Sequence, residues 1–255
     1  MIVNDFSALK KRIGRFLNSK KFERDEVFDL VELSQKLGRV AIFGGMLRDL
    51  CIGGNRFFDS DVDLVFEQHD RGNLESLLKE YKFKLNAFGG YRIQLKKWHV
   101  DIWNIENTWA FKNNLVKMDG FKSLTKTTFF NWDAIVYEVD SGDIHSAENY
   151  LMNLHEYYLD INLVDNPNTL GTVVRSLRMM IKLNAKLSPE LRDYLFYNMG
   201  KFNSDVIVAY ERQKYWRATL SSEIISNIFF NLKYHKANQL SGAFELPSKQ
   251  YILDL

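Results

Sequence analysis

The chain has 255 residues and a mass of 30.0 kDa; its 46% hydrophobic and 26% charged residues are typical of a globular protein and exclude a disordered chain. A single cysteine, Cys51, excludes a disulfide framework and a cysteine-rich zinc site. The 34 basic and 32 acidic residues leave a net charge of +2, which excludes a nucleic-acid-binding module that works by bulk charge. No apolar run approaches the ~20 residues of a membrane helix, so the sequence predicts a cytoplasmic protein without a membrane partner.

The expected elements change in kind along the chain. Two helices are expected in the first 37 residues, because apolar residues recur there at helical spacing. The strands expected next are Arg39–Phe43, Val62–Phe66, a hairpin of Arg92–Leu95 with His99–Ile105, and Ala134–Val139, with a polar helix around Asn73–Tyr81 among them. From about Tyr150 the apolar period is helical, and Ser188-Pro189 marks a helix start. Strands followed by helices predict an α+β head over residues 1–148 and a smaller all-α domain over residues 149–255.

The residues that favour a specific chemistry lie between the first two strands. Gly44-Gly45 ends a strand and precedes a helix, so the backbone can approach a phosphate at a helix N-terminus, where Arg48 adds a planar cation. Asp61 and Asp63 stand at the head of the next strand, and alternation places both side chains on one side of it. Two carboxylates ~7 Å apart along one strand face can share hard divalent cations.

At these residues the sequence resembles a known family. GGMLRD followed by SDVDLVF is similar to the signature GGxxRD…DxD of the class II poly(A) polymerase and tRNA nucleotidyltransferase (CCA-adding) family. That family belongs to the polymerase-β-like nucleotidyltransferase superfamily. Further similar segments are HVDIW, FFNWDAIVYEVDSGDIHS and TVVRSLRMMIKL. The resemblance implies a polymerase-β-like head with a mixed sheet and helices, followed by a helical, neck-like domain.

The resemblance also implies roles for individual residues. Asp61 and Asp63 would bind two Mg²⁺ ions, and HVDIW would bring Asp101 to them as the third carboxylate. The residues implied to bind the nucleotide are Gly44, Gly45, Arg48, Asp49, Arg175 and Arg178. The substrate would be a nucleoside triphosphate, ATP or CTP, and the acceptor hydroxyl would be an RNA 3′ end.

The sequence also departs from the family pattern. The gap between Arg48-Asp49 and the acidic pair is longer than usual, which leaves Asp59 with Asp61 as an alternative pair. Thr127-Thr128-Phe129 replaces the usual Arg-Arg-Asp, and Gly171-Thr172 stands where an acidic pair is expected before Arg175. Because no carboxylate stands one turn before the arginines, we expect looser nucleotide selection than in a CCA-adding enzyme.

The sequence therefore favours a metal-dependent nucleotidyltransferase that releases pyrophosphate. Two alternatives stay open at this point: transfer to a small molecule, as in aminoglycoside nucleotidyltransferases, and a non-catalytic nucleotide- or RNA-binding module on the same fold. Retention of all three carboxylates favours catalysis, because clustering like charges without a metal is costly. The sequence makes no prediction of the oligomeric state.

Overall fold

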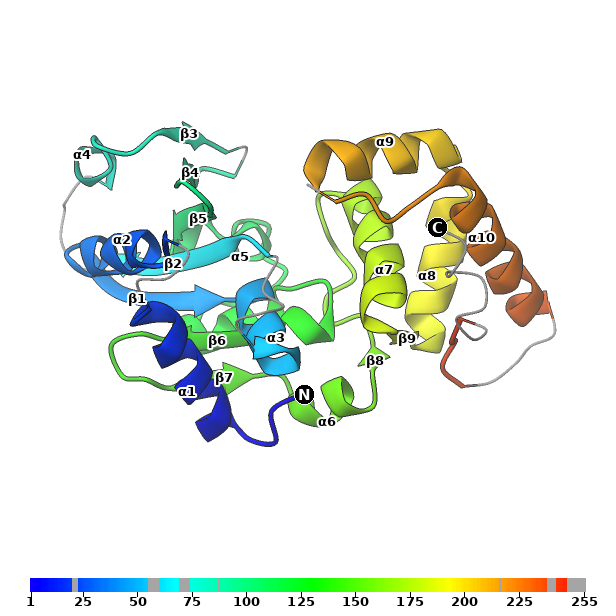
Figure 1. Ribbon diagram of the computed structural model, residues 1–255, viewed down its shortest axis with the longest axis horizontal. Coiled ribbons are helices and arrows are strands. Elements are labelled where there is room, and N and C mark those ends of the chain that lie inside the picture. The colour runs from blue at the N-terminus through cyan, green and yellow to red at the C-terminus, as the bar shows by residue number, and fades with distance from the viewer. Residues whose placement is uncertain are drawn as a thin grey trace. The chain divides into compact units, whose positions relative to one another are not determined.

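The computed structural model describes residues 1–19, 23–54, 60–68, 74–86, 88–215, 217–237 and 242–246. The chain forms two compact units, Met1–Leu154 and His155–Leu255 (Figure 1). Within the described residues, no helix combines the length and the apolar composition needed to cross a membrane. The assignment of 1–148 and 149–255 as functional domains stays a prediction.

The first unit is built on a mixed sheet in the order β3-β4-β5-β2-β1-β6-β7, counting the strands of the described residues. The strands are β1 Gly38–Phe43, β2 Val62–Gln68, β3 Phe83–Leu85, β4 Tyr91–Gln94, β5 His99–Asn104, β6 Ile135–Glu138 and β7 Ile144–Ser146. β2 and β5 run parallel, and the other neighbouring strands run antiparallel. The predicted α+β class with a mixed sheet is confirmed.

Helices and short helical turns accompany this sheet. They are α1 Phe6–Leu17, α2 Asp25–Gln35, α3 Gly45–Ile52, α4 Leu74–Leu77, η3 Ile105–Asn107, α5 Trp109–Lys112, η4 Phe121–Lys126, η5 Asn131–Asp133 and α6 Tyr150–His155. The polar helix expected around residues 73–81 is shorter than predicted, because among the described residues 74–81 only the four of α4 are α-helical. Arg12 of α1 donates to the carbonyls of Leu50 (2.6 Å) and Cys51 (3.0 Å), so α1 holds the C-terminal end of α3.

The described residues of the second unit are helical apart from the short strand pair of β8 and β9 and a single bridge between Leu187 and Phe244. Its elements are β8 Tyr158–Leu159, α7 Thr169–Leu183, β9 Lys186–Leu187, α8 Pro189–Met199, α9 Ser204–Lys214 and α10 Ser222–Ala237. The predicted start of α8 is confirmed, since the Ser188 hydroxyl accepts from the Leu191 N–H at 3.0 Å and Pro189 occupies the first turn. Val173, Val174 and Leu177 of α7 are fully buried, which fits the apolar stripe in the sequence.

Candidate active site

Three neighbouring strands carry charged residues in one row across the sheet. Asp63 of β2 is in register with Asp101 of β5, and Asp101 is in register with Arg92 of β4. Residues directly opposite one another in a sheet project from the same face. The fold therefore brings together two carboxylates that are 38 positions apart in the sequence, and it places an arginine beside them.

Asp61 lies two residues before Asp63, in the segment before β2, and contacts this row through Arg92. Arg92 forms an ion pair with Asp61, and its Nη1 lies 3.7 Å from Asp101 Oδ2. His99 Nδ1 lies 3.8 Å from Asp61 Oδ1. The side chains of Asp61 and Arg92 are 43% and 41% exposed, and that of Asp101 is 21% exposed. These charged groups are therefore accessible to solvent and to ligands, and we call Asp61, Asp63 and Asp101 the carboxylate cluster.

The chemistry of this cluster fits hard divalent cations, because carboxylate oxygens are the ligands that Mg²⁺ prefers. A cationic group already lies among them, since the Arg92 guanidinium pairs with Asp61 and approaches Asp101. Among the described residues, no group of three or more His, Cys, Asp or Glu side chains is arranged as a ready metal site. The carboxylates are thus suitable ligands for a divalent cation, but in this structure two of them, Asp61 and Asp101, contact an arginine.

The glycine pair lies at the same end of the sheet as Asp63. Gly44 follows β1 with φ +72°, a conformation that L side chains rarely adopt. A Cβ on Gly44 would be 3.9 Å from Asp63 Oδ2, and a Cβ on Gly45 would be 3.2 Å from the Ser60 hydroxyl. The turn therefore requires glycine for its backbone at the first position and for close packing at the second, and it places the N-terminus of α3 near Asp63.

Arg48 and Asp49 of α3, the helix that begins at this turn, lie in a buried polar network. The Arg48 guanidinium contacts Asp49 Oδ1 at 2.8 Å and Asp133 Oδ1 at 2.5 Å, and it donates to the Ser60 hydroxyl at 2.9 Å. Burial alone would lower the pKa of Arg48, but the two carboxylates outweigh it and raise the pKa above its ordinary value. Ser60 in turn donates to Asp49 Oδ2 at 2.5 Å. Arg48 thus pairs with carboxylates outside the carboxylate cluster.

Sequence reasoning assigned no role to Arg92. A signal for it was present, however, because a hairpin of residues 92–95 and 99–105 with a short connection sets Arg92 opposite Asp101. Counting the register from that connection would have placed the arginine in the row. Asp59, the alternative first carboxylate, lies outside the described residues.

Arg175 and Arg178 lie on α7, in the second unit. Arg178 is 6% exposed and pairs with Glu211 of α9; its Nη1 also donates to the Arg217 carbonyl and the Thr219 hydroxyl, both at 3.0 Å. Its guanidinium lies 3.9 Å from the centre of the Tyr215 ring. An acidic partner for Arg178 therefore exists, but it comes from a residue 33 positions later instead of from the preceding turn of α7.

Solved structures that are similar to this chain include CCA-adding enzymes and a tRNA-processing enzyme. A CCA-adding enzyme in complex with CTP matches 91% of this chain at a TM-score of 0.59 and 14% identity. The Thermotoga maritima CCA-adding enzyme complexed with tRNA matches 92% at a TM-score of 0.58 and 16% identity. A tRNA-processing enzyme with CTP matches 82% at a TM-score of 0.52 and 17% identity.

These likenesses confirm the nucleotidyltransferase head fold that the sequence predicts, and at such identities they show the fold alone. The matched regions cover 55% of the first of these proteins and 56% of each of the other two, so the chain spans little more than half of their length. No family model matches the sequence, and no curated protein matches it.

Proposed function

We propose that the chain is a metal-dependent nucleotidyltransferase that transfers a nucleoside monophosphate from ATP or CTP to an RNA 3′ end. The observation that carries the proposal is the juxtaposition of the carboxylate cluster with the Gly44-Gly45 turn, at one end of a sheet with the nucleotidyltransferase fold. Oxygen ligands for a cation and a backbone turn that can approach phosphate are the two parts that triphosphate chemistry needs.

The proposal assigns one task to each part of the site. Asp61, Asp63 and Asp101 would hold two Mg²⁺ ions, which when bound neutralise charge on the triphosphate and lower the pKa of the acceptor hydroxyl. Gly44 and Gly45 would let the backbone at the N-terminus of α3 approach the β- and γ-phosphates closely, while the Gly44 N–H itself donates to the Ile135 carbonyl at 3.0 Å and holds the turn against β6. Phosphoryl transfer asks little covalent chemistry of the protein, so orientation of these groups accounts for most of the expected rate enhancement.

The buried pair Arg48–Asp49 holds together the segments that carry the site. Its contacts to Asp133 and Ser60 tie α3 to the segment before β2 and to the turn before β6. These contacts fix the glycine turn against the start of β2, where Asp63 lies. We propose that the pair positions the phosphate-binding turn, in addition to the phosphate contact that the resemblance implies for Arg48.

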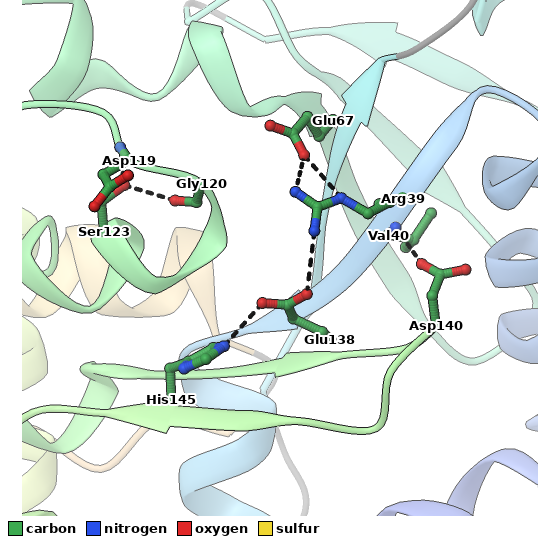
Figure 2. Close-up of polar contacts among 9 residues, drawn as sticks. All are labelled: Arg39, Val40, Glu67, Asp119, Gly120, Ser123, Glu138, Asp140 and His145. Atoms are coloured by element: carbon green, nitrogen blue, oxygen red, sulfur yellow. Dashed lines mark hydrogen bonds and ion pairs between the residues drawn. The ribbon is translucent and has the colours of Figure 1, made fainter.

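The test is transfer of label from each of the four α-³²P-labelled nucleoside triphosphates with Mg²⁺ and the full chain. Total RNA, a mixture of aminoglycosides, and buffer alone are the three acceptor arms. The inactive variant is Asp63→Asn. Asp140→Asn is the matched control, because this exposed acid lies beyond β6, at the opposite end of β1 from the glycine turn. Asp140 accepts a hydrogen bond from the Val40 N–H at 2.9 Å, and the side-chain oxygen of Asn can accept the same bond (Figure 2).

Label in RNA with the wild type and with Asp140→Asn, and none with Asp63→Asn, is the expected result. Label in aminoglycosides alone would replace the RNA acceptor by a small molecule. The absence of product in every arm would overturn the enzymatic proposal in favour of a non-catalytic binding module.

A further inference from the structure

Arg92 contacts two of the three residues of the carboxylate cluster. It pairs with Asp61, its Nη1 is 3.7 Å from Asp101 Oδ2, and it follows Asp63 and Asp101 in the same row across the sheet. Asp63 and Asp101 are directly opposite each other in the sheet, and Asp61 and Asp101 share Arg92, so their negative charges repel and an opposite charge beside them relieves that repulsion. In the structure this charge is supplied by the side chain of the protein itself.

We propose that Arg92 is a built-in competitor of the divalent cation, so that a metal ion binds the cluster only by displacing the guanidinium from Asp61 and Asp101. This inference rests on the proposed function, because it takes the carboxylate cluster as the metal site. It makes Arg92 a positioning residue that keeps Asp61 and Asp101 paired in the absence of metal and sets how tightly the cluster binds a cation.

The exposure of the pair explains why such a competitor can be displaced. Asp61 and Arg92 are both more than two-fifths exposed, so water screens their attraction, and ion pairs of this kind hold weakly. A buried pair would instead resist separation, because each charge would be left without solvent. The flexible Arg92 side chain can also turn into solvent without disturbing the strand that carries it.

Arg39 offers a matched comparison in the same sheet. It lies on β1, pairs with Glu67 of β2 and lies 3.7 Å from Glu138 of β6, and its side chain is 46% exposed (Figure 2). Arg39 and Arg92 therefore share residue type, exposure and a carboxylate partner from β2 or the segment before it. They differ in position, because Arg39 lies at the end of β1 away from the glycine turn and the carboxylate cluster.

The test is Mn²⁺ binding to the full chain without nucleotide, measured by electron paramagnetic resonance of the free ion. Arg92→Gln and Arg92→Met remove the charge, Arg92→Lys retains it, and Arg39→Gln removes an equal charge elsewhere. Loss of one positive charge at a few ångströms from a divalent ion in screened solvent corresponds to a Kd lower by on the order of three- to tenfold. Circular dichroism checks that each variant is folded.

The expected result is tighter Mn²⁺ binding by Arg92→Gln and Arg92→Met and wild-type affinity for Arg92→Lys and Arg39→Gln. A gain in affinity distinguishes competition from a merely structural role, because damage to the site would weaken binding. Unchanged or weaker binding by folded Arg92→Gln and Arg92→Met would overturn the inference, and so would an equal gain in Arg39→Gln. If the wild type does not bind Mn²⁺, or if Asp63→Asn binds it equally well, the carboxylate cluster is not a metal site. Both the metal site of the proposed function and this inference are then refuted.

Discussion

Replacing Arg48 by alanine tests whether the polar network under the glycine turn stabilises the first unit. The guanidinium is 10% exposed, and its two carboxylate partners, Asp49 and Asp133, are 9% and 6% exposed. Arg48→Ala would leave both carboxylates in a low-dielectric environment without their counter-charge. The Ser60 hydroxyl would also lose one of its contacts.

The size of the effect follows from burial. Removing one partner of a buried ion pair costs about 3–5 kcal/mol of the free energy of unfolding, because an uncompensated charge stays buried. For a unit of this size, each kcal/mol lowers the melting temperature by roughly 2–4 °C, so Arg48→Ala should melt about 6–20 °C below the wild type. Arg39→Ala is the control, since its pair with Glu67 is 46% and 28% exposed and should contribute about 1 kcal/mol or less.

Urea denaturation followed by circular dichroism gives both free energies, and Arg48→Ala combined with Asp133→Asn closes a double-mutant cycle. We expect the double variant to lose less than the sum of the single losses, by about 0.5–3 kcal/mol. A loss below 1 kcal/mol for Arg48→Ala, or a loss equal to that of Arg39→Ala, would refute the reasoning.

A nucleotide titration of folded Arg48→Ala tests the phosphate contact that the resemblance implies for Arg48. Nucleotide binding weaker by about 1.5–3 kcal/mol supports a phosphate contact, and unchanged affinity removes Arg48 from the nucleotide site.

Three further predictions concern Gly44, Cys51 and the choice of nucleotide. Gly44→Ala should destabilise the protein by about 1–2 kcal/mol in urea denaturation, because its φ of +72° is strained for an L side chain; a neutral result would contradict that conformation. Cys51 is fully buried, and desolvation raises its pKa to about 12, so Ellman's reagent should label it only after urea is added. Rapid labelling of the native protein would show that the thiol is exposed. Sequencing RNA 3′ ends after reaction with all four nucleoside triphosphates should show mixed additions, whereas ordered C-C-A would contradict loose selection.

The sequence predicts most accurately those elements whose formation depends on interactions between residues close together in the chain. Arg39–Phe43 and Val62–Phe66 were predictable as strands because each is a continuous or alternating apolar run beside turn residues, and β1 and β2 lie there. The start of α8 was predictable because Ser188 and Pro189 act within one turn. Two short edge strands, β3 and β7, were missed, because three-residue strands with few buried side chains leave no periodic pattern.

The networks that connect these elements were not predictable in the same way. The distant partner of Arg48 is 85 positions away at Asp133, and the partner of Arg178 is 33 positions away at Glu211. Pairing at such separations depends on how helices and turns pack, and no local spacing encodes it. Arg92 is the intermediate case, since its place beside Asp101 follows from a short hairpin connection once register is considered.

The packing around α7 gives the expectation of loose nucleotide selection a physical basis. Glu211 is fully buried; besides pairing with Arg178, it accepts from the N–H of Thr219 at 3.0 Å and of Leu220 at 2.8 Å. Its oxygens are therefore committed inside the second unit and cannot accept from the exocyclic amine of a base. Arg175, three residues before Arg178, is only partly buried and is the more accessible of the two arginines. A guanidinium can donate to a base or stack on it but cannot accept, so Arg175 alone would not reproduce the paired donor and acceptor by which C and A are told apart from G and U.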